Sequence, residues 1–519
     1  MRLAAIDVGS NSVHMVVADV DPDGRIEVVD RVKEMVRLGR HTFTTGRLSE
    51  HAMELGLEAV KTFARLARAR RVDRIRAVAT SAVREAENGA AFVRRLRRAT
   101  ALPVRVISGA DEARLIFRAA RHALGLAGGP HLLVDVGGGS VELVLVRDGH
   151  PVWMQSFPLG ASRLGERFFA SDPPGRREVA RLERHLEREL GDLLTATRHG
   201  GVVRAVGTSG TVNALVLLAR AARGDDVGRL HGASATAREI ARLRRRLLAL
   251  PAAKRADLPG MDAKRVDLLP AAAVLVDFVL ARAGAPQLVA CGWALREGVL
   301  LDLAGAGRAA DAAPAVRRRS VEALAAQFAG ENPHGRQVAR LALALFDGIA
   351  EALGLRAPLR ELLEYAALLH DIGHAIDHDR HHHHSSYLIR NAELLGFERI
   401  EVDVIGHIVR GHRKQMPKLA DPELDRLPRS LSRAVRTLAG ILRVADALDR
   451  THFGVVRGLD VALGAHRLAI TAEVTGDKPE IELWAATRRA EGLARLLDRR
   501  VVLNCRTVGG RAGLRASAS

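Results

Sequence analysis

The sequence contains the same short pattern twice, and this repetition restricts the fold more than any other feature. The run Asp135–Glu142 reads Asp-Val-Gly-Gly-Gly-Ser-Val-Glu between two apolar stretches, which predicts strand, glycine turn and strand. The run Asp7–Ser12 reads Asp-Val-Gly-Ser-Asn-Ser and also follows one apolar stretch and precedes another. Two hairpins of one design predict two related lobes that face a cleft.

Each turn has the composition of a phosphate-binding loop. Glycine leaves no Cβ between backbone and ligand, so that N–H groups can close around an anion. Asp135 and Glu142 are suited to hold a divalent cation, directly or through water. A lone glycine-rich hairpin with two solvated carboxylates would need no ligand. The second copy favours a clamp that binds phosphate and metal.

Other residues between and after the hairpins have two possible roles. Arg84 follows a predicted strand and either binds a phosphate bidentately or lies on the surface. Asp111 and Glu112 open a predicted helix, where acids usually act as structural caps, although one that faced a cleft could deprotonate a water molecule. The run Gly207–Thr211 places glycines and hydroxyls at a helix N-terminus, which is a further potential anion site.

Composition limits the class of protein. The chain has 519 residues, which is more than a single hydrophobic core usually accommodates, so we predict three or four domains. The formal net charge of +19 attracts polyanions, but the excess arginines are spread along the chain. Two distant cysteines, Cys291 and Cys505, exclude a disulfide framework. The sequence starts without a signal-peptide pattern and has no run of 18 apolar residues, so we expect a cytoplasmic protein without a membrane or specific nucleic acid partner.

The C-terminal half carries histidines and aspartates on predicted helices. It begins after a composition break at residues 304–319. One helix opens at His334, another closes at His370-Asp371, and Asp446 lies on a later one. Histidine and aspartate are suitable ligands for a transition metal or Mg²⁺. This half is therefore a candidate for a second metal site.

Taken together, the N-terminal motifs resemble the exopolyphosphatase / guanosine pentaphosphate phosphatase (Ppx/GppA) family, within the sugar kinase–Hsp70–actin superfamily. The resemblance covers residues 1 to about 305 and rests on five stretches in the family's order: residues 5–12, 107–114, 134–142, 207–211 and 292–298. It implies an α/β fold in which two ribonuclease H-like lobes enclose a phosphate cleft. It also implies that Glu112 is the catalytic acid, although Asp111 stands where the family commonly has Glu.

The resemblance implies metal-assisted hydrolysis of a terminal phosphoanhydride bond. Glu112 would activate the water, and Asp135 and Glu142 would hold Mg²⁺ or Mn²⁺. The implied phosphate-binding residues are Asp7, Gly9, Ser10, Asn11, Ser12, Arg84, Gly137, Gly138, Gly139, Ser140, Gly207, Thr208, Ser209 and Gly210. The substrate would be inorganic polyphosphate, which the net charge favours, or guanosine pentaphosphate (pppGpp). A nucleotide-binding sensor without catalysis would be indicated by a lost Glu112 or broken turns, and both are intact.

The C-terminal half resembles an HD domain, a metal-dependent phosphohydrolase fold. The pattern H…HD…D maps onto His334, His370, Asp371 and Asp446, and two further ligands are implied at His384 and His412. We expect His374, which shares a helix face with His370, to be solvated or packed. The resemblance leaves open whether this site binds a second divalent metal and whether it acts as a nucleotide phosphohydrolase.

These patterns predict a chain of six parts: lobe I at 1–128, lobe II at 129–305, a linker at 306–319, an all-α HD-like domain at 320–453, a small α+β module at 454–507 and a disordered tail at 508–519. Within the α+β module, alternation predicts a strand at Ile481–Trp484 and then a helix at Ala485–Asp498. The family resemblance also implies a homodimer.

Overall fold

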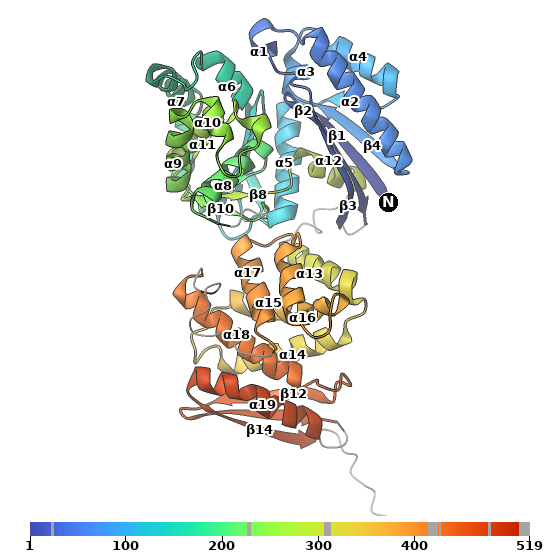
Figure 1. The fold of residues 1–519 in the computed structure, drawn as a ribbon, viewed down its shortest axis with the longest axis vertical. Helices are drawn as coiled ribbons and strands as arrows, with labels where there is room; N and C mark the ends of the chain where they lie inside the picture. The colour runs from blue at the N-terminus through green and yellow to red at the C-terminus, as the bar shows by residue number, and fades with distance from the viewer. Residues whose placement is uncertain are drawn as a thin grey trace, which may run out of the picture. The chain divides into compact units, whose positions relative to one another are not determined.

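The computed structural model describes residues 1–21, 25–225, 230–305, 313–413, 424, 427–475 and 479–507. It divides into two compact units, Met1–Arg317 and Arg318–Ser519, each described here by itself (Figure 1). The division falls within the predicted linker, but residues 313–319 are helical and begin α13 (Ala313–Ala329). The predicted tail at 508–519 lies outside the described residues. Among the described helices, none combines the length and apolarity needed to cross a membrane.

The first unit contains a five-stranded sheet in the order β3-β2-β1-β4-β5. Three strands form an antiparallel meander and two add in parallel: β1 (Arg2–Val8), β2 (Ser12–Val20) and β3 (Ile26–Met35), then β4 (Arg74–Ala79) and β5 (Val104–Val106). The helices that follow in sequence are α1 (Thr42–Thr45), α2 (Glu50–Ala69), α3 (Ser81–Glu85), α4 (Gly89–Thr100) and α5 (Gly109–Leu124). The buried faces of α2 and α4 close a core with β1, β2 and β4.

The second sheet repeats this order as β8-β7-β6-β9-β11, with one extra strand, β10, at its edge. Its strands are β6 (Pro130–Val136), β7 (Val141–Arg147), β8 (His150–Phe157), β9 (Arg204–Gly207), β10 (Ser234–Thr236) and β11 (Gln287–Ala290). Its helices are α6 (Ala161–Phe168), α7 (Arg176–Arg198), α8 (Gly210–Ala222), α9 (Ala237–Ala249), α10 (Ala252–Ala256), η1 (Ala263–Arg265), α11 (Leu269–Ala283) and α12 (Leu295–Ala304). The shared topology confirms the prediction of two related lobes.

Each lobe is completed by a helix that belongs, by sequence, to the other. Helix α5 packs against β7 and β8 of the second sheet, whereas α12 returns to pack against β1 and β2 of the first (Figure 1). The two helices also pack on each other, and at Gly298 a Cβ would lie 2.1 Å from the carbonyl oxygen of Leu115. A boundary at residue 128 therefore does not separate the lobes in space.

The second unit combines a helical bundle with a three-stranded sheet in the order β12-β13-β14. After α13 come α14 (Pro333–Ile349), α15 (Pro358–Leu369), η3 (Ile372–Ala375), α16 (His381–Asn391), α17 (Arg399–Arg410), α18 (Arg429–Ala447), β12 (Val456–Leu463), β13 (Arg467–Val474), α19 (Glu480–Leu497) and β14 (Arg500–Thr507). Helices and sheet contribute to one continuous hydrophobic core.

The predicted strand at Ile481–Trp484 is wrong, because these residues form the first turn of α19. Pro479 lies directly before the helix, where a backbone N–H has no partner within the helix. Proline lacks this N–H, so it loses no helical hydrogen bond there. The alternation of apolar and polar residues is misleading here, because Glu482 is buried whereas Ile481 and Trp484 are exposed. Oε1 of Glu482 accepts a 2.5 Å hydrogen bond from Oγ1 of Thr451.

Candidate functional site

The two repeated hairpins have the same turn geometry, and their turns meet. Gly9 N donates to Ser12 O at 3.1 Å, and Gly137 N donates to Ser140 O at 3.0 Å. A Cβ on Gly138 would lie 3.0 Å from Cβ of Ser10, so the backbones approach closely. The two predicted jaws of the clamp therefore lie at one place.

Helix α6 supports the second turn from behind. The carbonyl oxygens of the three glycines accept hydrogen bonds from N–H groups at the start of this helix: Gly139 from Gly160 (3.2 Å), Gly137 from Ala161 (2.9 Å) and Gly138 from Ser162 (3.0 Å). These bonds fix the carbonyls toward α6, which sets the orientation of the peptide planes of the turn.

A cavity of about 420 Å³ lies where the turns meet. The predicted site residues that line it are Asp7, Gly9, Ser10, Asn11, Ser12, Glu112, Asp135, Gly137, Gly138, Gly139, Ser140, Thr208, Ser209 and Gly210. They come from the two hairpin turns, the N-terminus of α5 and the turn before α8. Ser108 caps α5 by accepting from Asp111 N at 3.0 Å, and this cap places Glu112 in the first turn of the helix.

Two predicted phosphate ligands are absent from the cavity lining. A Cβ on Gly207 would lie 2.3 Å from Cγ1 of Val212, so this glycine allows α8 to start close to its strand. Arg84 donates through Nη1 to Glu112 Oε2 (3.0 Å) and to the carbonyl of Ile107 (3.0 Å). Its guanidinium therefore positions Glu112, while phosphate binding by Arg84 stays a prediction.

The predicted metal ligand Glu142 lies behind the cavity wall. It is 2 % exposed and accepts a 2.7 Å hydrogen bond from Ser156 Oγ. Burial, together with the carboxylates of Glu112 and Asp135, raises its pKa well above the usual range. Glu142 pairs with Asp135 across the hairpin, and the matching partner of Asp7 in the first hairpin is His14. The two hairpins share a backbone design but differ in chemistry here.

The cavity brings together three carboxylates with raised pKa values. Burial raises the pKa of Asp7 to about 7 and that of Glu112 to about 7, the latter despite Arg84. Burial also raises the pKa of Asp135 to about 6, although Thr208 Oγ1 donates to it at 2.5 Å. Oδ1 of Asp7 is buried without a hydrogen-bond partner. This donor set fits a divalent cation, which Asp7 and Asp135 would hold.

The raised pKa of Asp7 implies that the free energy of unfolding depends on pH. Since the folded pKa exceeds that of the unfolded chain, folding takes up a proton between pH 4 and 7, and stability is lost as the pH rises through this window. We expect Asp7→Asn to stabilise the protein in EDTA at pH 8 by about 1–3 kcal/mol. Thermal denaturation at pH 8 and pH 4 checks this. The gain should disappear at pH 4, and an equal gain at both values would contradict it.

Four basic side chains also line the cavity, and none was predicted: Arg31, Lys33, Arg265 and Arg296. Arg296 Nη1 contacts His14 Nδ1 at 3.0 Å. Burial and the charges of Arg296 and Lys33 lower the pKa of His14 to about 2, so this histidine is neutral. Only Arg296 carried a sequence signal, because it belongs to the family-like stretch 292–298. The cavity thus combines carboxylates, backbone turns and cations.

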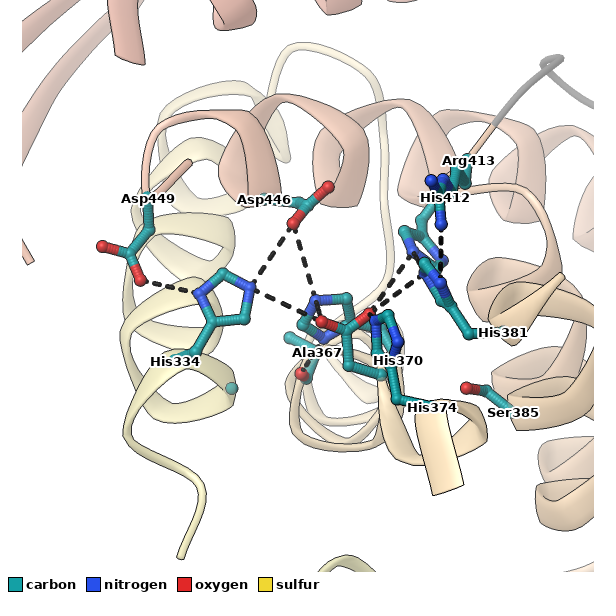
Figure 2. Close-up of polar contacts among 12 residues, drawn as sticks. His334, Ala367, His370, His374, His381, Ser385, His412, Arg413, Asp446 and Asp449 are labelled. Atoms are coloured by element: carbon teal, nitrogen blue, oxygen red, sulfur yellow. Dashed lines mark hydrogen bonds and ion pairs between the residues drawn. The ribbon is translucent and has the colours of Figure 1, made fainter. Parts of the chain in front are cut away.

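In the C-terminal unit, the four residues of the H…HD…D pattern lie together. Figure 2 labels three of them, His334, His370 and Asp446. Nε2 of His334 lies 3.5 Å from Asp446 Oδ1 and 3.8 Å from Asp371 Oδ2. Nε2 of His370 lies 3.6 Å and 3.5 Å from the same two oxygens. Neither nitrogen has a hydrogen-bond partner, and His370 is 1 % exposed. Unpartnered imidazole nitrogens that converge on carboxylates fit a metal ion.

Outer contacts orient both histidines. Nδ1 of His334 lies 2.7 Å from Asp449 Oδ2, and Nδ1 of His370 lies 2.8 Å from the carbonyl of Ala367. Such partners place the proton on Nδ1 and leave Nε2 as the ligand atom. Although burial opposes it, the carboxylates of Asp446 and Asp449 raise the pKa of His334 to about 9. The cluster therefore attracts positive charge. Asp449 was not predicted.

The structure corrects the assignment of one further histidine. Nε2 of His384 lies 4.0 Å from Asp377 Oδ2, and its side chain is 31 % exposed. His381, three residues earlier on α16, instead places Nε2 3.2 Å from Asp371 Oδ1. His412, as predicted, belongs to the cluster, with Nε2 3.8 Å from the same oxygen. His374 also lies there, at 3.6 Å, rather than being only solvated or packed.

Comparisons with known proteins agree with the two-lobed fold. The Ppx/GppA phosphatase family model matches residues 16–306, and the model for Ppx/GppA phosphatase domain III matches residues 316–464. The chain is similar to the crystal structure of an exopolyphosphatase from Cytophaga hutchinsonii, with 29% identity over 59% of this chain and 98% of that one (TM-score 0.55). It is also similar to a Ppx/GppA family member from Aquifex aeolicus, with 31% identity over 58% and 97% (TM-score 0.51).

Proposed function

Because the chain belongs to the Ppx/GppA phosphatase family, and is thus a hydrolase of phosphoanhydride bonds, we propose that its cleft is an exopolyphosphatase site. The observation that carries the proposal is the position of Glu112, which lines the same cavity as both glycine turns. The cavity of about 420 Å³ is therefore lined by a base, by backbone turns that can bind an anion and by carboxylates that can hold a cation.

In this mechanism Glu112 orients a water molecule and accepts its proton. A carboxylate whose pKa lies near 7 is suited to this role at neutral pH. The water oxygen attacks the terminal phosphorus, and the bond to the bridging oxygen breaks. Orthophosphate leaves, and the shortened chain keeps the bridging oxygen. N–H groups of the two turns stabilise the charge on the phosphoryl oxygens.

A divalent cation, Mg²⁺ or Mn²⁺, would be held by Asp7 and Asp135 in the same cavity. When bound, it neutralises charge on the phosphate oxygens. The position of Glu142 behind the wall supports an indirect role, in which its hydrogen bond with Ser156 and its pairing with Asp135 position the latter. Arg84 likewise acts through Glu112.

The lining of the cavity favours polyphosphate over pppGpp. Among the described residues that line it, none is Phe, Tyr or Trp, and the one imidazole, that of His14, is held by contacts with Ser12 and Arg296, so a guanine base finds no large ring on which to stack. The four cations, in contrast, suit successive phosphate groups. Orthophosphate release should be measured with Mg²⁺ from long-chain polyphosphate and from pppGpp. We expect a higher kcat/KM for polyphosphate. A higher value for pppGpp would overturn the substrate assignment, and no release from either would overturn the function.

The unpredicted cations supply a further test of the substrate. Lys33 lines the cavity, and burial together with Arg265 lowers its pKa, as expected for an ammonium held among other cations. We expect Lys33→Ala to raise KM for polyphosphate about tenfold with little change in kcat, because one phosphate contact is worth roughly 1–2 kcal/mol. Initial rates over a range of polyphosphate concentrations measure the split.

Lys61→Ala provides the matched control, since Lys61 pairs with Glu58 on the surface of α2. It should leave both constants unchanged. If Lys33→Ala behaved like Lys61→Ala, polyphosphate would not contact this part of the cavity.

A further inference from the structure

One arginine on α6 reaches from the second lobe to the first. The guanidinium of Arg163 donates through Nε to the carbonyl oxygen of Gly139 at 2.8 Å and through Nη2 to Glu85 Oε2 at 2.6 Å. Gly139 belongs to the second glycine turn, whereas Glu85 is the last residue of α3 in the first lobe. The arginine side chain is 16 % exposed. A single, largely buried side chain therefore connects the two lobes at a phosphate turn.

The ring of Phe43 orients this guanidinium. Cζ of Arg163 lies 4.0 Å from the centroid of the ring. Phe43 belongs to α1 and packs against the core of the first lobe. A Cβ on Gly139 would lie 2.3 Å from Cζ of the same ring, so the second turn also packs closely against it. Because a planar guanidinium stacks on an aromatic face, the first lobe determines where the Arg163 side chain lies.

The contacts continue from Glu85 to the first glycine turn. Oγ of Ser81 donates to Glu85 Oε1 at 2.7 Å, and the N–H of Ala82 donates to Ser10 Oγ at 3.2 Å. Ser81 and Ala82 are the first two residues of α3. This short helix therefore contacts the first turn directly and reaches the second through Glu85 and Arg163.

The bond from Arg163 determines which way the peptide between Gly139 and Ser140 faces. The C=O and N–H groups of a planar trans peptide point in opposite directions. The carbonyl of Gly139 faces Arg163 and the start of α6, where it also accepts from Gly160 N at 3.2 Å. The N–H of Ser140, a residue that lines the cavity, therefore points away from α6. It is available to an oxygen on which charge develops during phosphoryl transfer.

We propose that Arg163 is a positioning residue for the reaction in the cleft. Together with Phe43 and Glu85 it forms a latch that holds the second glycine turn against the first lobe, with the N–H of Ser140 directed at the phosphoryl group. Arg163 does not line the cavity, so it acts through the carbonyl of Gly139 rather than by contact with the substrate. This inference rests on the proposed function, because it assigns the latch to phosphoanhydride hydrolysis.

Steady-state kinetics of Arg163→Ala test this role. A displaced oxyanion donor weakens the transition state more than the bound substrate, so we expect kcat for orthophosphate release from polyphosphate to fall about 10²-fold, with KM within about threefold of the wild type. Arg163→Lys should stay about tenfold below the wild type, because a point charge does not replace the planar fork that reaches Gly139 and Glu85.

Arg167→Ala is the matched control. Arg167 also belongs to α6 and also lies over an aromatic ring, that of Phe168, but this ring is in the same lobe. Both kinetic constants of Arg167→Ala should equal those of the wild type. Thermal denaturation shows whether each variant is folded, and Arg163→Lys, which keeps the positive charge, replaces Arg163→Ala in the comparison if the latter does not fold.

A double-mutant cycle tests whether Arg163 and Glu85 act together. Glu85→Gln keeps the shape of the side chain but removes the charge that the guanidinium meets at 2.6 Å. We expect it to lower kcat about fivefold in the wild type and less than about twofold in Arg163→Ala, because the latch is already open there. Two independent effects that multiply would overturn the latch.

Orthovanadate tests the turn without turnover, because its five-coordinate adducts resemble the transition state of phosphoryl transfer. Calorimetry with Mg²⁺ should show that Arg163→Ala binds vanadate at least about tenfold more weakly, while the affinity for orthophosphate stays within about threefold. Equal losses for both anions, or wild-type kcat in folded Arg163→Ala, would overturn the latch alone. Absence of orthophosphate release from the wild type would instead overturn the proposed function.

Discussion

Replacement of Glu112 by Gln is expected to lower kcat for orthophosphate release from polyphosphate by about 10²–10⁴-fold, the usual contribution of a general base. The substitution keeps the shape of the side chain and an oxygen for Arg84, but it removes the group that accepts the proton. Substrate binding should change little, because the glycine turns and the cavity cations remain. Steady-state kinetics with Mg²⁺ should therefore show a loss in kcat and a nearly constant KM.

Two controls make the test of Glu112 specific. Asp111→Asn alters the neighbouring acid, whose side chain is 52 % exposed and pairs with Arg114, and it should leave kcat within about threefold of the wild type. His370→Ala removes a histidine of the cluster in the second unit and should also leave the release of orthophosphate intact. Full activity in Glu112→Gln would exclude the cleft mechanism. Abolished activity in folded His370→Ala would move the reaction to the histidine cluster.

The second large effect is expected at a residue that contributes no side chain at all. A Cβ on Gly160 would lie 2.4 Å from the carbonyl carbon and oxygen of Gly138 and 2.4 Å from the carbonyl carbon of Gly139. These are backbone atoms of the glycine turn, so that no side-chain rotation can relieve the contact. Gly160→Ala must therefore displace the turn, and a displacement of about 1 Å costs roughly 10²-fold in rate. We expect a fall of that size in kcat/KM for polyphosphate.

Gly165→Ala is the control for Gly160→Ala. It lies within α6, the helix that Gly160 precedes, and its Cβ would meet only Cβ of Ala271, at 4.0 Å, which is an ordinary contact. Alanine within a helix is also favoured over glycine, so this variant should be fully active and slightly more stable. Unchanged kinetics in Gly160→Ala would show that α6 does not fix the geometry of the phosphate turn.

The glycine turns could be predicted from sequence because their chemistry is local. Each comprises a strand, a turn and a strand in adjacent residues, so that Asp7 and Asp135 could be placed at strand ends without knowledge of the fold. The repeat then predicted the shared topology. The roles of Arg84 and Glu142 could not be read in this way, since each depends on what lies on the far side of the cavity wall. Arg84 is held by Glu112 and Ile107, and Glu142 by Ser156.

The cavity cations were missed for a different reason. Lys33 lies on β3, and Arg265 ends a short 3-10 helix far away in sequence; in a chain with 79 Lys and Arg, neither stands out. Their proximity is a result of tertiary structure alone. In the C-terminal unit, the choice of His384 over His381 failed by less than one helical turn. The four consecutive histidines project from different sides of α16, so the sequence does not show which of them belongs to the cluster. Packing of the helix determines that His381 faces Asp371.

The exchange of α5 and α12 between the lobes has a consequence for synthesis of the chain. Strands β1 and β2 leave the ribosome first, yet the helix that covers part of them, α12, ends only at Ala304. Apolar surface of the N-terminal sheet therefore stays uncovered until almost 200 further residues have been synthesised after its last strand, β5. Nascent chains in this condition are natural clients of chaperones. We therefore expect the two lobes to reach the native state together rather than in succession.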